Sequence, residues 1–211
     1  MSSSSKEAIL AAARRAAQAH GYSGLNFREL ADQVGIKAAS IYHHFPSKAD
    51  LGAAVAKRYC EDTAAELESM LAETSDPAQC LRQYPDIFRK SLEADNRMCL
   101  CSFMAAEYDD LPEAVKKEVQ TFADVNVAWL SKALSAAAVV NSGESERRAR
   151  AIFAAVAGAQ LMARSRSDIS LFDSLIESYR VAGLLPAQTV RAGRSSGAPG
   201  KSGGVRSRRL A

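Results

Sequence analysis

The side chains best suited to contact a polyanion lie close together in one short stretch, residues 27–48. Lys37, Ser40, Tyr42, His43 and His44 carry ammonium, hydroxyl and imidazole groups within eight positions. Such groups donate hydrogen bonds to phosphate oxygens and to the acceptor edges of bases. The composition of this stretch is therefore typical of a surface that meets nucleic acid.

Two short helices must position these side chains. Residues 27–34 predict a helix whose apolar positions recur at i, i+3, i+4 and i+7, namely Phe27, Leu30, Ala31 and Val34. Gly35 can take a positive φ and end this helix sharply. A second helix over about residues 38–45 would bury Ile41 and Phe45 and leave its polar side chains elsewhere. Helix, glycine turn and short second helix form the outline of a helix-turn-helix.

Catalytic and metal-binding patterns are missing from the sequence. It contains no HExxH, GxSxG, P-loop or GxGxxG motif. The adjacent histidines 43 and 44 would point about 100° apart on a helix, so they are poor joint ligands for a metal. We therefore expect no enzyme, no metal site and no cofactor.

The rest of the chain is predicted to be helical as well, which makes the fold all-α with about nine helices. Apolar periods and capping residues place these helices at about residues 4–20, 27–34, 38–45, 47–71, 77–94, 98–108, 111–138, 144–164 and 168–184. We expect three segments: a helix-turn-helix domain (1–48), a helical effector-binding and dimerisation domain (49–185), and a disordered basic tail (186–211).

Charge is distributed unevenly along these segments. Residues 1–60 contain eight Lys and Arg against four Asp and Glu, whereas residues 61–185 contain thirteen against twenty. The tail has six Lys and Arg and no acid. This distribution favours nucleic-acid contact at the front of the chain, with the tail adding phosphate attraction or only solvated charge. The sequence lacks a long apolar stretch and a signal peptide, so we expect a cytoplasmic protein that has no membrane partner.

Residues 35–51, GIKAASIYHHFPSKADL, make the pattern more specific. They resemble the DNA-binding domain of TetR-family transcriptional regulators, which has a glycine turn, an Ile/Leu-Tyr-x-His/Tyr-Phe core and a following Ser/Pro-x-Lys. The close resemblance covers about residues 5–55. It implies a homodimeric repressor that leaves a palindromic operator in double-stranded DNA when a small-molecule effector binds. Lys37 departs from the family, in which Ser or Thr often caps this helix.

The resemblance also implies roles for individual residues. The N-terminal end of the second helix would approach base edges with Lys37, Ala38, Ala39 and Ser40, where an alanine methyl suits a thymine methyl. Phosphate contacts are expected from Arg28, Tyr42, His43, His44 and Lys48. Lys48 would otherwise oppose the dipole of its own helix, since it lies in the first turn.

Two further sets of residues are implied for the larger domain. An apolar effector pocket is expected from inward-facing residues of the middle helices: Phe88, Leu92, Phe103, Met104, Phe122, Val125, Trp129 and Met162. Dimerisation through the last two long helices would use Ala154, Ala155, Gly158, Leu161, Phe172, Leu175, Ile176 and Tyr179. A run of small side chains at residues 154–163 allows a partner helix to approach closely, although it would also suit a buried helix.

Cys99 and Cys101 leave a second function open. They lie near the predicted start of a helix, where the helix dipole lowers the pKa of a thiol. Some TetR-family regulators that respond to electrophiles resemble this stretch, so a thiol-based sensor is one alternative. The other interpretation is that both cysteines pack as small core residues. A more distant alternative is a helical ligand-binding protein that has no DNA function.

Overall fold

The computed structural model describes residues 2–188, and the predicted all-α fold is confirmed there. This part of the chain forms nine α-helices and two 3-10 helices and has no strand. The helices are α1 (Ser2–His20), α2 (Phe27–Val34), α3 (Ala38–His44), α4 (Lys48–Ala72), α5 (Pro77–Glu93), α6 (Leu100–Ala106), η1 (Tyr108–Asp110), α7 (Glu113–Ala136), η2 (Ser142–Glu144), α8 (Ser145–Arg166) and α9 (Ile169–Val181). The predicted basic tail lies outside the described residues from position 189 onward.

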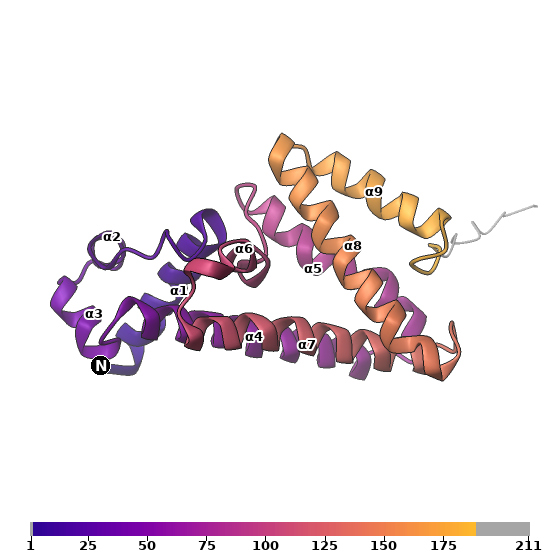
Figure 1. The fold of residues 1–211 in the computed structure, drawn as a ribbon, viewed down its shortest axis with the longest axis horizontal. Helices are drawn as coiled ribbons and strands as arrows, with labels where there is room; N and C mark the ends of the chain where they lie inside the picture. The colour runs from indigo at the N-terminus through magenta and orange to yellow at the C-terminus, as the bar shows by residue number, and fades with distance from the viewer. Residues whose placement is uncertain (1, 189–211) are drawn as a thin grey trace, which may run out of the picture.

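The short helices α2 and α3 lie at one end of the molecule, and α8 and α9 lie toward the other (Figure 1). The long helices α4 and α7 run along each other between these ends and are in extensive contact. α4 buries Leu51, Val55, Tyr59 and Leu67 at helical spacing, so one continuous face joins the front of the chain to its body. None of the helices in the described part is long and apolar enough to cross a membrane.

Helices α6, α7 and α9 are each shorter than the sequence predicts, and α6 shows a tertiary reason. The expected helix from Met98 to Tyr108 is reduced to α6, Leu100–Ala106. At its start, the Met98 N–H donates to the Gln18 carbonyl of α1 instead of entering a helix. At its end, the Glu107 N–H bonds the Met104 carbonyl, three residues back, and the chain continues into η1. Tertiary contacts with α1 therefore replace helical turns that local periodicity favours.

Candidate nucleic-acid interface

The predicted pair of short helices is confirmed, and local capping explains its geometry. The Asn26 side chain accepts hydrogen bonds from the N–H groups of Arg28 (2.9 Å) and Glu29 (3.4 Å), so α2 starts at Phe27. Glu29 in turn accepts from the Asn26 amide at 3.2 Å. At the other end Gly35 has φ 74°, a left-handed conformation that stops α2 before α3 begins.

α3 turns its apolar side chains inward and its polar side chains outward. Ile41 and Phe45 are buried, as the sequence predicts. Lys37 stands at the N-cap of α3 and makes no side-chain capping bond, which confirms that this position lacks the cap common in the family. The outward set is formed by Lys37, Ala39, Ser40, Tyr42 and His43, which are exposed, and by Ala38 and His44, which are half-buried.

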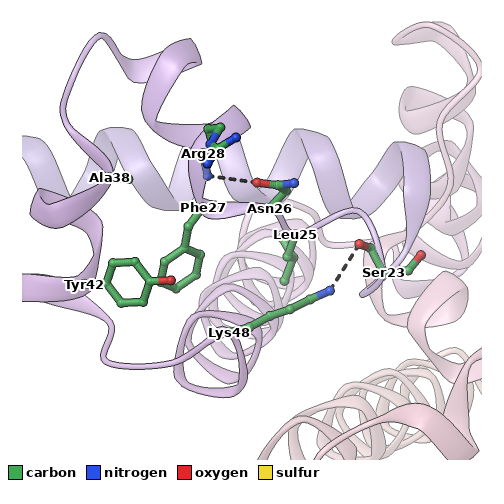
Figure 2. Close-up of a pocket in the computed structure, with 8 residues that line it drawn as sticks. All are labelled: Ser23, Leu25, Asn26, Phe27, Arg28, Ala38, Tyr42 and Lys48. Carbon is green, nitrogen blue, oxygen red and sulfur yellow. Dashed lines mark hydrogen bonds between the residues drawn. The ribbon is translucent and has the colours of Figure 1, made fainter.

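A groove between α2, α3 and the start of α4 gathers four of the nine candidate residues (Figure 2). It encloses about 620 Å³ and is lined by Ser23, Leu25, Asn26, Phe27, Arg28, Ala38, Tyr42 and Lys48. The exposed Tyr42 ring packs against Phe27, with ring centroids 4.7 Å apart. The lining includes two cations and no carboxylate, so it is suited to an anion.

Lys48 reaches this groove from the first turn of α4. Its Nζ donates to the Ser23 carbonyl at 3.2 Å and lies 4.7 Å from the centre of the Tyr22 ring. The ammonium group therefore sits beside the N-terminal end of α2 (Figure 2). Tyr22 and Ser23 are not among the site residues that the sequence predicts. The one sequence feature that points to them is their position between two predicted helices.

The predicted effector pocket is filled by its own aromatic side chains. Tyr84 stacks on Trp129 with centroids 5.8 Å apart, and Phe153 packs against Phe88 and Phe122. Of the predicted set, the buried residues are Phe88, Leu92, Met104, Phe122 and Trp129, and the half-buried ones are Phe103 and Val125. The cluster also contains a buried hydrogen bond, which the Tyr84 hydroxyl donates to Asn126 Oδ1 at 2.9 Å.

The prediction that Met162 faces inward to this pocket is wrong. Its side chain is 47% exposed, next to Leu161, which is 56% exposed. Both lie on the outward face of α8, whereas Ala159, Gln160 and Ala163 form its buried face. The position of Met162 about the helix axis is set by the packing of α8 against α5, α7 and α9.

The predicted dimerisation residues separate into two groups. Ala154, Gly158 and Leu161 are exposed along α8. Three others are half-buried: Ala155, Leu175 and Tyr179. Phe172 and Ile176 are wrong as surface residues, since they are 1% and 2% exposed within this chain. They lie on the face of α9 that packs against α5 and α8 of the same protomer.

The expectation of a lowered thiol pKa at Cys99 is also wrong. Cys99 is the N-cap of α6 and is only 1% exposed. Burial raises its pKa above the usual value, and hydrogen bonds with Ser102 and Tyr59 offset this only in part. Burial likewise raises the pKa of Cys101 well above its ordinary range. Desolvation of the thiolate outweighs the short helix dipole.

All four cysteines should consequently react slowly with thiol reagents in the native protein. They are free and buried, and the raised pKa values of Cys99 and Cys101 keep these thiols protonated at pH 7 to 8. Labelling with an aromatic disulfide reagent should reach four thiols per chain only in denaturant. Rapid labelling of one native thiol, lost in Cys99→Ser, would contradict this expectation.

Comparison with known proteins identifies the front of the chain. The family described as bacterial regulatory proteins, tetR family, matches residues 9–55. The transcriptional activator FasR of Mycolicibacterium smegmatis is 30% identical over 89 residues, 42% of this chain and 41% of that protein. The transcriptional repressor AcnR of Corynebacterium diphtheriae is 37% identical over 68 residues, 32% of this chain and 34% of that protein. The matches thus span less than half the length of these two relatives.

Solved structures extend the likeness to the body. A TetR transcriptional regulator from Legionella pneumophila superposes with a TM-score of 0.79 at 29% identity. The match covers 84% of this chain and 96% of that one. The arrangement of α4 to α9 is therefore shared along with the helix-turn-helix.

Proposed function

The chain belongs to the TetR family of bacterial regulatory proteins, and from this premise we propose that it is a DNA-binding transcriptional regulator. The observation that carries the proposal is the groove at α2 and α3. It places Arg28, Tyr42 and Lys48 around one cavity, beside an α3 surface of small and hydroxyl side chains. Such an arrangement suits phosphate contacts around a helix that reads base edges.

In the proposed complex α3 enters the major groove. Lys37, Ala39 and Ser40 are exposed at its N-terminal end, which is the end that approaches base edges in a helix-turn-helix. Arg28, Tyr42 and Lys48 would contact phosphates, fix the register of α3 and contribute little to sequence preference. His43 and His44 would add contacts from the far end of α3.

A two-fold dimer would present two such helices to a palindromic site. The support lies on α8, where Ala154, Gly158 and Leu161 are exposed at i, i+4 and i+7 and form a stripe that faces away from the chain's own core. Small side chains allow a second copy of α8 to approach closely. Two recognition helices about 34–36 Å apart would then read successive turns of the same DNA face.

We further propose that the regulator is a repressor released by an apolar or aromatic effector. The aromatic cluster of the body is connected directly to α4, because Trp129 Nε1 donates to the Leu67 carbonyl at 2.7 Å and the Tyr59 and Phe122 rings lie 5.5 Å apart. An effector that opens the cluster would displace α4, whose first residue is Lys48. Preferential binding of the effector to the displaced state would lower DNA affinity.

Binding of the purified protein to the DNA upstream of its own gene tests the proposal. Fluorescence anisotropy should give an affinity that falls steeply with salt, with a slope of about −0.9 in log K against log [salt] for each phosphate contact. Salt-insensitive binding, or no binding at low salt, would instead favour a helical ligand-binding protein without DNA function. The thiol-sensor alternative has less support, since its candidate thiol is buried and burial raises its pKa.

A further inference from the structure

Glu107, at the end of α6, holds the loop between α1 and α2. Its carboxylate accepts hydrogen bonds from the backbone N–H groups of Tyr22 (2.5 Å) and Ser23 (3.2 Å). The preceding residue, Gly21, has φ 69°, and a Cβ at this position would collide with the Glu107 carboxylate. The glycine thus provides both the turn and the space that the carboxylate occupies. These bonds connect positions more than eighty residues apart.

The loop that Glu107 holds is also the loop that anchors Lys48. The Ser23 carbonyl accepts from Lys48 Nζ, and the Tyr22 ring lies beneath the same ammonium group. Tyr22 fits closely against α4, because a Cβ on Gly52 would lie only 2.7 Å from its ring. Two glycines therefore allow α6, this loop and the first turns of α4 to meet at one point. Three residues further on, the loop reaches Asn26 and the start of α2.

A second charged side chain of the body holds the end of α1. The Arg164 guanidinium, from α8, donates to the Ala19 carbonyl at 2.8 Å and to the Asn96 carbonyl at 2.6 Å. It also lies 5.0 Å from the centre of the Phe103 ring. The Arg164 cation binds a backbone carbonyl at the end of α1, and the Glu107 carboxylate binds the backbone N–H groups that follow. Each charge is therefore opposite in sign to the backbone dipole that it contacts. Two side chains of the body, Glu107 and Arg164, therefore bind the backbone at the end of α1 and in the loop that follows it.

We propose that Glu107 is a positioning residue for DNA binding, which acts by holding the Tyr22–Ser23 backbone so that Lys48 and the start of α2 face phosphate together. This inference rests on the proposed function. The carboxylate binds two amide donors at once, and this orients the Ser23 carbonyl toward Lys48. If the carboxylate is lost or withdrawn, the loop is released, and Lys48 loses its anchor without any change in α3.

Two substitutions separate this role from simple charge. Glu107→Gln removes the charge and must turn an NH₂ group toward one of the two N–H donors. Glu107→Asp keeps the charge but shortens the reach by one methylene. Both should weaken binding to the upstream DNA fragment about tenfold. Glu68→Gln, on the exposed face of α4, removes a comparable charge from an ion pair with Lys132 and should leave the affinity unchanged.

Coupling to Lys48 provides the readout that a merely structural role would not give. Lys48→Ala should cost less affinity, and change the salt slope less, in the Glu107→Asp background than in the parent protein. Equal costs in both backgrounds would overturn the inference. So would tighter binding by Glu107→Gln with unchanged binding by Glu107→Asp, because that result would mean only repulsion of DNA. Absence of salt-dependent binding by the parent protein itself would reject the proposed function instead, before any variant is compared.

Discussion

Replacing Tyr42 and Lys48 together by alanine is expected to lower the affinity for the upstream DNA about 100-fold for each bound protomer at moderate salt, the loss that corresponds to two contacts of roughly 1–1.5 kcal/mol each. Both side chains line the same groove. Tyr42 is 56% exposed, although its ring packs against the ring of Phe27. Removal of Lys48 should also reduce the magnitude of the salt slope by about 0.9 for each protomer. Fluorescence anisotropy over a series of salt concentrations measures both quantities.

The controls for this prediction separate local contacts from net charge and from folding. Lys132→Ala removes one cation from the exposed surface of α7, where Lys132 pairs with Glu68, and should change the affinity little. Tyr42→Phe keeps the ring that packs on Phe27 and tests the hydroxyl alone. Circular dichroism should show unchanged helix content in all variants. Binding by the double variant with the parent affinity and salt slope would reject α2 and α3 as the DNA-contacting surface.

Ala154→Glu is expected to dissociate the proposed dimer, raising its Kd about 100-fold or more because the interface would bury two unpaired carboxylates, one from each protomer. Ala154 is exposed in the single chain, so the substitution should leave the fold of the protomer intact. DNA affinity should fall together with dimerisation, since one recognition helix reads only half of a palindrome. Sedimentation velocity across a range of concentrations measures the Kd.

The matched control places the same substitution on another exposed helix surface. Ala65→Glu lies on the exposed face of α4 and should leave both dimerisation and DNA binding unchanged. Gly158→Glu, one turn along the stripe from Ala154, should reproduce the effect of Ala154→Glu. A dimer of unchanged Kd in both stripe variants would show that α8 does not form the interface.

The helix-turn-helix could be predicted from the sequence because its determinants are local. Asn26 caps α2 and Gly35 ends it. Apolar side chains at helical spacing determine which faces of α2 and α3 are buried. Each of these preferences acts within a few residues, and tertiary packing does not override it in the folded chain. The bounds of α2 agree with the prediction at both ends, and Ile41 and Phe45 are buried as expected.

The side chains of the body were harder to place, because apolar residues cover more than one face of α8 and α9. Periodicity marks Met162, Phe172 and Ile176 as helical and apolar, but the packing of these helices against α5 and α7 decides which face is covered. Met162 therefore points outward, and Phe172 and Ile176 point inward. The prediction of a lowered pKa for Cys99 is wrong for a related reason, because burial by distant segments outweighs the position of the thiol at a helix start.

Local sequence patterns are sufficient to predict the helices of residues 2–188, the position of the two short helices and the polar side chains that α3 exposes. The contacts of Glu107, Gly21 and Lys48 at the loop between α1 and α2 depend instead on tertiary packing. Helix propensity and capping depend on neighbours along the chain, and they can be recognised one segment at a time. A carboxylate that binds two amide groups more than eighty residues away depends on how whole helices pack, and no local pattern records that packing.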